Sequence, residues 1–336
     1  MRAFSQPGGP RLAVLSYHSW DVEPAVLGAD IRALRKDGWR FVSAREALDF
    51  VHGRLAGTDE RLALVTSDDG HPEDVEFRDT LRREGCPGVT FVNVGRADAD
   101  RLAWFRETHS EEWSVQDHGP LHRRQFVSGH LTGVVHGQKI GGLEYLALPM
   151  GAPLLASAGQ LASPRFDPHP EVIALAAEWA SEQGTATISS PAWLAEISER
   201  LRRLRLAYRW RSRTYVVGSL ETNEEFERRV KREVAEGRTA FEDALGHAPT
   251  MFAYPWWQGS SIGDDELSRS GYEATFAGTG YVQGRAMSPY SIPRVVMDPT
   301  TPRPLNLAEF AERSTSSWSG LRGRVERAAK RMMGVI

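Results

Sequence analysis

Residues 61–70 read RLALVTSDDG, an apolar run that ends in two aspartates and a glycine. A continuous apolar run of this kind is typical of a strand that is buried on both faces of a parallel sheet. Parallel α/β folds bind ligands at the carboxyl ends of their strands, so polar residues at such an end are candidates for function. The stretch therefore predicts a buried parallel strand that carries Asp68 and Asp69 to the functional edge of the sheet.

The sequence on both sides of this stretch repeats the pattern. Helix-like segments separate apolar runs at 11–18 (RLAVLSYH), 39–43 (WRFVS) and 88–95 (GVTFVNVG). Strands that alternate with helices predict βα units around a parallel sheet or barrel. The same rhythm returns late in the chain, at 250–257 (TMFAYPWW), 271–278 (GYEATFAG) and 290–298 (YSIPRVVMD). We therefore expect one barrel domain that is interrupted by a long insertion.

Composition and charge narrow the class of protein. The chain has 336 residues, and its 41 Lys and Arg against 44 Asp and Glu give a formal net charge of −3. This balance argues against a nucleic-acid binder whose affinity depends on phosphate neutralisation. The single cysteine, Cys86, excludes an intrachain disulfide and a cysteine-rich zinc module, and it fits a reducing compartment.

Two further features bear on location. The residues before the first apolar run, MRAFSQPGGP, lack the apolar segment of a signal peptide. The longest uncharged stretch, Tyr145 to Pro164, is interrupted by prolines and glycines, which argues against a membrane-spanning helix. We therefore expect a cytoplasmic protein with no signal peptide or transmembrane helix.

The adjacent aspartates have two interpretations. Two neighbouring carboxylates disfavour joint ionisation unless a metal cation binds one of them and leaves the other to act as a base. Alternatively, Asp68 and Asp69 belong to a solvated Asp-Asp-Gly turn that caps the next helix.

A second motif, DHGPLH at 117–122, follows another apolar run. Two histidines four residues apart lie on one face of a helical turn, and Pro120 suits the first turn of that helix. With Asp69, His118 and His122 give a site of two histidines and one carboxylate with open positions, which suits a Zn²⁺-type ion. The alternatives are a pair of solvent-facing histidines or an Fe²⁺ oxygenase, which the same ligand set permits.

Taken together, VTSDDG, GVTFVNVG, DHGPLH and FAYPWW resemble the polysaccharide deacetylase (NodB homology) family, carbohydrate esterase family four. The resemblance covers roughly residues 10–122 and 248–298. It implies an α/β fold, a distorted (β/α) barrel of seven or eight strands. It also implies hydrolysis of an acetamide on an amino sugar, with the help of a metal.

The family's roles transfer to matching positions. Asp68 would be the general base that activates water for attack on the N-acyl carbonyl. Asp69, His118 and His122 would bind one divalent ion, Zn²⁺ first, with Co²⁺, Ni²⁺, Mn²⁺ or Fe²⁺ as alternatives. The backbone N–H of Trp256 would help to bind the oxyanion.

The aromatic residues around Pro255 are candidates for binding substrate. Tyr254, Trp256 and Trp257 are placed to stack on sugar faces, or one or two of them belong to the core.

Three departures from the family pattern concern catalysis. Ser67 replaces a phenylalanine, and Tyr254 stands where many members carry the arginine that orients the catalytic aspartate. Arg294, in SIPRVV, is our candidate for that role, with a surface ion pair as the alternative. No histidine follows His247, so the general acid that protonates the leaving amine is not identified, and His18 at the end of the first strand is the first candidate for the pocket.

The expected domains follow from these segments. Residues 10–122 and 248–304 would form the barrel, residues 123–247 an insertion that shapes the substrate site, and residues 305–336 C-terminal helices. Within the insertion we expect helices at Pro170–Gln183, Pro191–Arg211 and Thr222–Leu245. Its uncharged stretch, Tyr145 to Pro164, is expected to form a subdomain core rather than a flap over the groove.

Two basic segments suggest partners. Seven arginines between Arg200 and Arg213 accompany Tyr208 and Trp210, and this segment would bind phosphate or an anionic lipid surface, or form a solvated helix face paired with glutamates. The tail from Leu321 to Ile336 forms a basic amphipathic stripe, which would lie on a membrane surface or dock on the barrel.

The sequence thus predicts a metal-dependent N-deacetylase of an amino sugar in a glycan, glycolipid or glycoside precursor. The substrate would be lipid-linked if the basic segments face a membrane. The alternatives are a carbohydrate-binding relative that has lost turnover, and an O-deacetylase or other amide hydrolase on the same scaffold. The oligomeric state is not indicated, and no nucleic-acid partner is expected.

Overall fold

The computed structural model describes residues 11–55, 60–137, 139–280, 282–283, 288–301 and 303 of the chain. Their contacts divide them into two compact units. The first unit contains the described residues up to Pro120, those of 238–253, and those from Gly271 onward. The second unit contains 121–237 and 254–270. Each unit is described by itself.

The first unit is built on a closed barrel of parallel strands. Its strands are β1 (Arg11–His18), β3 (Arg61–Asp68), β4 (Gly88–Val92), β5 (Trp113–Asp117), β12 (Met251–Ala253), β13 (Ala274–Thr279) and β15 (Ile292–Val296). They pair in the order β1-β15-β13-β12-β5-β4-β3, and β3 pairs with β1 to close the ring. The structure therefore confirms the (β/α) barrel class, with seven parallel strands among the described residues.

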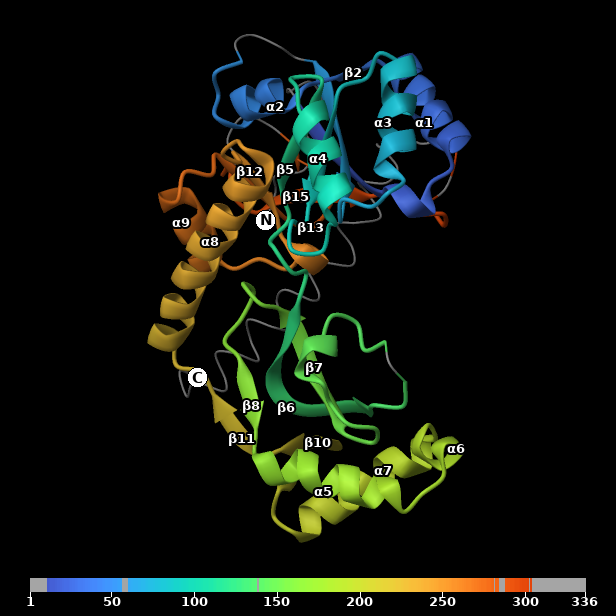
Figure 1. Ribbon diagram of the computed structural model, residues 1–336, viewed down its shortest axis with the longest axis vertical. Coiled ribbons are helices and arrows are strands. Elements are labelled where there is room, and N and C mark those ends of the chain that lie inside the picture. Colours follow the sequence, from blue (N-terminus) through green and yellow to red (C-terminus); the bar gives the residue numbers. More distant parts are fainter. Residues whose placement is uncertain are drawn as a thin grey trace. The chain divides into compact units, whose positions relative to one another are not determined.

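Further elements surround the barrel. The remaining strands are β2 (Trp39–Phe41), parallel to the first half of β3, and β14 (Val282–Gln283), antiparallel to β1. The helices are α1 (Pro24–Lys36), α2 (Ala44–Val51), α3 (Asp74–Arg83), α4 (Ala99–Thr108) and the short η1 (Ser19–Asp21). Helices α1 and α3 lie side by side along the barrel (Figure 1).

The barrel strands are buried on both faces, as their apolar runs predict. Leu12 and Val14 of β1 belong to one core cluster, which gathers side chains from six barrel strands and α2. Ala13 and Leu15 belong to another, which includes the apolar faces of α1 and α3. Because successive side chains of a strand point to opposite faces, these clusters are the inside of the barrel and its outer layer.

The second unit joins antiparallel strands to helices. The strands are β6 (Arg124–Val134), β7 (Pro153–Gly159), β8 (Phe166–Pro168), β9 (Ala207–Trp210), β10 (Arg213–Val216) and β11 (Gly218–Leu220). The helices are α5 (Pro170–Ser181), α6 (Thr185–Ile188), α7 (Pro191–Arg203), α9 (Ser261–Arg269), η2 (Glu144–Leu146) and η3 (Pro255–Trp257). The longest helix, α8 (Asn223–Leu245), begins in this unit and ends in the first.

One core holds the second unit together. The strands of its main sheet pair in the order β7-β6-β10-β9. Helices α5 and α7 lie along one face of this sheet (Figure 1). Leu155 of the uncharged stretch is buried there, with Leu146, Leu148 and Leu154 packed against the cluster. The stretch from 145 to 164 therefore contributes to a core, as expected.

One helix prediction was too long. Helix α7 ends at Arg203 rather than at Arg211, and the chain continues as the β9–β10 hairpin. The arginines of α7 pair with glutamates one turn away, as in Arg200 with Glu196 and Arg203 with Glu199. The prediction failed because Ala207 and Val216 pack into the sheet side of the core, which the arginine-rich pattern does not reveal.

No helix among the described residues is both long and apolar enough to cross a membrane. The predicted C-terminal helices at 305–336, with the basic tail from Leu321 to Ile336, lie outside the described residues.

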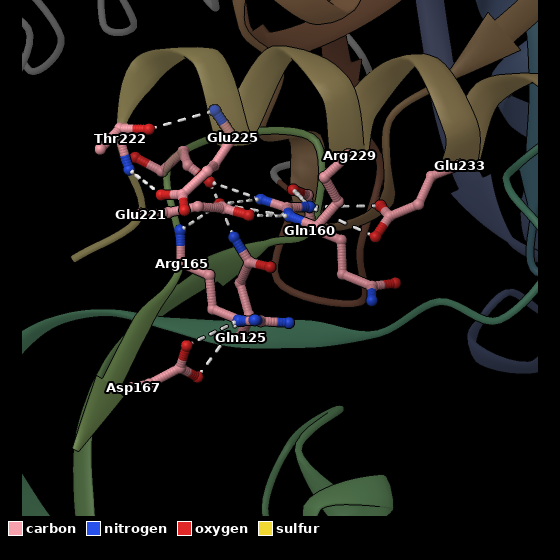
Figure 2. A network of polar contacts seen from close by, with 10 residues as sticks. Gln125, Gln160, Arg165, Asp167, Glu221, Thr222, Glu225, Arg229 and Glu233 are labelled. Atoms are coloured by element: carbon pink, nitrogen blue, oxygen red, sulfur yellow. Dashed lines mark hydrogen bonds and ion pairs between the residues drawn. The ribbon is translucent and has the colours of Figure 1, made fainter. Parts of the chain in front are cut away.

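Buried Arg229 of α8 is the centre of a polar network in the second unit (Figure 2). Its guanidinium donates to Glu221 at 2.9 Å and to the carbonyl oxygen of Gln160 at 2.8 Å. It also lies 3.3 Å from a carboxylate oxygen of Glu233 and 3.2 Å from the carbonyl oxygen of Ser163. Arg229 therefore ties α8 to the loop that follows β7.

Replacing Arg229 by methionine should destabilise the second unit strongly, because it leaves Glu221 and Glu233 partly buried without their cation. Loss of one partner of a buried ion pair costs about 3–5 kcal/mol. Urea unfolding should show this loss, whereas Arg228→Met at the exposed neighbouring position should change stability by less than about 0.5 kcal/mol. Equal stability of the two variants would contradict the role of Arg229.

Candidate active site

Asp68 forms a buried ion pair at the end of β3. Its two carboxylate oxygens accept hydrogen bonds from the two terminal nitrogens of Arg294, at 2.6 and 2.7 Å. Both side chains are almost inaccessible to solvent, at 2% exposure for Asp68 and 0% for Arg294. This bidentate geometry is the strongest that a carboxylate and a guanidinium form. Neither the helix-capping interpretation of Asp68 nor the surface interpretation of Arg294 fits this burial.

The ion pair determines the charge of Asp68. Burial by itself would raise the pKa of the carboxyl group, but the Arg294 guanidinium outweighs that effect, and His118 adds to it. The pKa of Asp68 is therefore held well below its usual range. Asp68 is an anion throughout the neutral range, with its orientation fixed by Arg294.

Asp69 leaves the strand in a turn of unusual backbone conformation. Its φ is +76°, and that of the next residue, Gly70, is +63°. A Cβ at Gly70 would lie 2.9 Å from the Val92 side chain, so glycine is required there. The left-handed conformation costs a non-glycine residue about 1–2 kcal/mol, and such strain is typical of functional sites.

His118 follows β5 and is oriented by a backbone carbonyl. Its Nδ1 lies 2.7 Å from the carbonyl oxygen of Ala253, at the end of β12. Because a carbonyl oxygen only accepts, Nδ1 carries the proton, and Nε2 is the unprotonated nitrogen. Nε2 lies 3.6 Å from Asp69 Oδ1 and 3.9 Å from Asp68 Oδ2.

The segment between the two histidines is an irregular loop, so the prediction of a helical turn at 117–122 was wrong. Gly119 and His122 both have positive φ, at +72° and +48°. The Asn93 side-chain amide donates to the carbonyl oxygens of His118 and Gly119, each at 2.8 Å. Pro120 accepts from the N–H of Gly95 at 2.9 Å. These bonds tie the loop to the end of β4 and leave it no helical pairing.

The loop still brings the histidines together. One ligand atom each from Asp69, His118 and His122 lie within 4.8 Å of one another.

The donor set fits a divalent ion. Two imidazoles and one carboxylate with open positions are the usual ligands of a catalytic Zn²⁺. Burial lowers the pKa of His118, despite the neighbouring aspartates, and so favours the neutral imidazole that a metal requires. The bond from Nδ1 to Ala253 fixes the tautomer that offers Nε2, as the outer contacts of metal-binding histidines commonly do.

Several supporting residues were missed by the sequence analysis. Buried Asp74 accepts hydrogen bonds from Ser67 and Thr90, both at 2.7 Å, and ties β3 to β4. Burial raises the pKa of Asp74 to about 6, although these hydrogen bonds act in the opposite direction. Asn93, whose amide bonds hold the histidine loop, is the second supporting residue that was missed. Asn93 was quoted only as part of the apolar run at 88–95, and no local pattern distinguishes such partners.

Asp117 supports the start of the histidine loop. It accepts from the N–H of Gly119 at 2.8 Å and from the hydroxyl of Tyr272. Burial raises the pKa of Asp117 to about 7, with Tyr272 as the main opposing influence.

His18 ends β1 and pairs in register with Asp68. Its side chain is half-buried, with Nδ1 3.8 Å from Asp21 and its ring centroid 5.6 Å from that of Trp20. The structure therefore places His18 on the strand end next to the catalytic candidate.

Trp256 and Trp257 lie in a strained turn of the second unit, with φ of +62° and +54°. The ring of Trp256 packs against His122, with the ring centroids 4.6 Å apart, and the Arg124 guanidinium lies 5.2 Å from its centroid. The turn is supported from the end of β7, because the N–H of Gly159 donates to the Gln258 side chain at 2.8 Å. Both tryptophans are half-buried.

Of the two alternatives for Tyr254, the structure shows the core position and contradicts the sugar-stacking role. Its side chain is fully buried, and its hydroxyl donates to Asp264 of α9 at 3.0 Å. The ring packs against Gly263, where an added Cβ would lie 2.5 Å from the hydroxyl. Tyr254 therefore anchors α9 and has no face open to a substrate.

Solved structures with this fold include known deacetylases. The chain is similar to a de-N-acetylase from Aggregatibacter actinomycetemcomitans, with a TM-score of 0.56 and 13% identity over 89% of this chain and 99% of that one. It is similar to the BpsB deacetylase domain from Bordetella bronchiseptica, with a TM-score of 0.54 and 15% identity over 86% and 96% of the chains.

A third similar structure is IcaB from Ammonifex degensii, with a TM-score of 0.51 and 17% identity over 88% of this chain and 94% of that one. These likenesses confirm the barrel fold that the family resemblance implied. No family model and no curated protein matches the chain.

Replacing Arg294 by methionine should raise the pKa of Asp68 above the ordinary value of about 3.9, because burial then acts without the guanidinium. In the wild type, the ion pair contributes its full stabilisation at pH values above the pKa that Asp68 has in the unfolded chain. This stabilisation is lost as pH falls through the lower pKa that Asp68 has in the folded protein. In the variant, stability should instead fall as pH rises above about 4.

Carboxyl carbon NMR titration of Asp68 measures this change directly. Arg101→Met is the control, because Arg101 donates to the Gly70 carbonyl and to Asp98 but not to Asp68. An Asp68 pKa that stays below its ordinary value in Arg294→Met would show that the guanidinium is not its cause.

Proposed function

We propose that this chain is a hydrolase of the polysaccharide deacetylase family that removes an N-acetyl or similar N-acyl group from an amino sugar. The observation that carries the proposal is the buried Asp68–Arg294 pair beside the Asp69–His118–His122 cluster. A carboxylate with a fixed orientation, beside three side chains that can bind a metal ion, suits the attack of water on an amide. The fold shared with solved de-N-acetylases supports the same reaction.

The candidate ligands define the contribution of a metal. Asp69, His118 and His122 would hold one divalent ion, Zn²⁺ first. When bound, such an ion supplies Lewis acidity that polarises the acyl carbonyl and lowers the pKa of water.

The remaining chemistry belongs to the side chains of the chain. Asp68 accepts a proton from the attacking water while Arg294 keeps its carboxylate in place. Water oxygen adds to the carbonyl carbon, the carbon–nitrogen bond breaks, and the amine takes up a proton to leave a free amino sugar and a carboxylate. That proton comes from protonated Asp68 or from His18. The N–H of Trp256 is the candidate donor to the developing oxyanion.

Replacing Asp68 by asparagine should lower deacetylation by about 10²–10⁴-fold, the range expected for loss of a general base. Acetate released from N-acetylglucosamine oligomers is the measurement, with N-formyl and O-acetyl sugars beside them to define the acyl group. Asp100→Asn on the exposed face of α4 is the control and should retain the wild-type rate. The retained metal content of Asp68→Asn would exclude a loss of fold.

Two outcomes would contradict the proposal. A wild-type chain that binds the sugars but releases no acetate would favour the carbohydrate-binding alternative. Turnover of O-acetyl sugars alone would favour an esterase on the same scaffold.

A further inference from the structure

The hairpin formed by β9 and β10 exposes a group of aromatic side chains. Tyr208 and Trp210 of β9 are 57% and 47% exposed, and the strand register places them opposite Tyr215 and Arg213 of β10. Because side chains alternate along a strand, these four residues share one face of the sheet. We refer to them, together with Arg211 at the turn, as the hairpin surface.

The other face of the same hairpin packs into the core of the second unit. Ala207 and Val216, which also pair in register, are buried in the core of the second unit. The fold of the unit therefore accounts for the inward face, whereas Tyr208, Trp210, Arg211 and Arg213 of the hairpin surface are exposed.

The hairpin carries positive charge that is not neutralised by close ion pairs. Arg205, Arg209, Arg211 and Arg213 are all exposed. Within the part of the chain that the structure describes, none of the four forms an ion pair of 4.0 Å or less. Arg209 contributes to a small extent to the lowered pKa of Glu199, which is due chiefly to the hydrogen bond with Arg203. Of the four, Arg211 and Arg213 belong to the hairpin surface, and their charge makes this surface complementary to an anionic partner.

The turn of the hairpin places a guanidinium next to an indole. Arg211 and Ser212 both have positive φ, at +47° and +64°, a conformation that glycine or asparagine usually supplies. In this turn the Arg211 guanidinium carbon lies 4.7 Å from the Trp210 ring centroid. Positive φ at both central residues is typical of a tight two-residue hairpin turn, and this turn holds Arg211 at the exposed end of the hairpin.

The arrangement of the rings distinguishes between classes of anionic partner. Tyr215 has Tyr208 stacked beside it, at 5.7 Å and 16°, and His130 at 5.3 Å. Arg211 lies over Trp210. Stacked sugars or nucleic-acid bases require open ring faces. Here Tyr215 covers one face of Tyr208 and Arg211 covers one face of Trp210. Exposed amphipathic rings beside guanidinium groups suit the headgroup layer of a membrane, where Trp and Tyr are enriched.

We propose that the hairpin surface binds the headgroup layer of anionic lipid membranes. The arginines bind lipid phosphates, and the edges of Tyr208 and Trp210 enter the interface between headgroups and acyl chains. This binding does not depend on the hydrolase chemistry, so its test is independent of activity.

Co-sedimentation of the full chain with phosphatidylcholine vesicles, with and without 30% phosphatidylglycerol, tests the proposal; roughly this anionic fraction gives a useful surface potential. The wild type should bind the anionic vesicles and not the neutral ones, with binding that weakens as salt rises. Both Arg211→Gln/Arg213→Gln and Trp210→Ser should weaken binding, the arginine variant by about tenfold or more. The control Arg82→Gln/Arg228→Gln removes the same charge from exposed positions elsewhere and should bind as the wild type does.

Three results would overturn the proposal. The first is absence of wild-type binding to anionic vesicles. The second is wild-type binding by either hairpin variant, with circular dichroism confirming that the variants fold, because another part of the chain would then be responsible. The third is retention of alginate or a single-stranded oligonucleotide that depends on the hairpin, without vesicle binding. That result would assign the surface to a soluble polyanion.

Discussion

The buried pair of Asp68 and Arg294 is the interaction on which the rest of the site depends. Arg294 belongs to β15 and Asp68 to β3, and β1 lies between these strands, so the pair links strands that do not touch. A charge this deeply buried is tolerated only when it is paired. Both oxygens of Asp68 face the guanidinium. Asp69, the more exposed neighbour, approaches His118 Nε2 more closely, at 3.6 Å against 3.9 Å for Asp68. The different surroundings of the two aspartates give them different roles.

A regular scaffold supports an irregular site. The barrel supplies buried strands, and the candidate ligands lie in the segments just after them, where Asp69 and His122 both have positive φ. Such conformations persist only where neighbouring contacts determine them. Here the Asn93 amide holds the carbonyls of the histidine loop, and the Ala253 carbonyl holds the His118 ring. Substitution of these supporting groups should therefore affect the site without removing a ligand.

The sequence was sufficient to predict the barrel and to predict which site residues lie close together. Apolar runs that end in Asp68, in Asp117 or before Tyr254 report burial directly, and parallel strands bring those ends to one edge. Local backbone was less predictable. The histidine loop was expected to be helical because spacing alone does not reveal the bonds from Asn93. For Tyr254 the sequence left a sugar-stacking role and a core position open, because an aromatic residue beside Pro255 shows nothing of its contact with Asp264. The end of α7 depended likewise on core contacts of the hairpin.

Metal content of the purified chain tests the central claim most directly. Elemental analysis after incubation with Zn²⁺ or Co²⁺ and removal of excess ion should find about one equivalent in the wild type and in a His136→Ala control. His118→Ala and His122→Ala should each lose it, while their circular dichroism stays that of the wild type. A wild-type chain that binds no divalent ion, or histidine variants that retain it fully, would contradict the proposed site and with it the assignment of hydrolysis to this edge of the barrel.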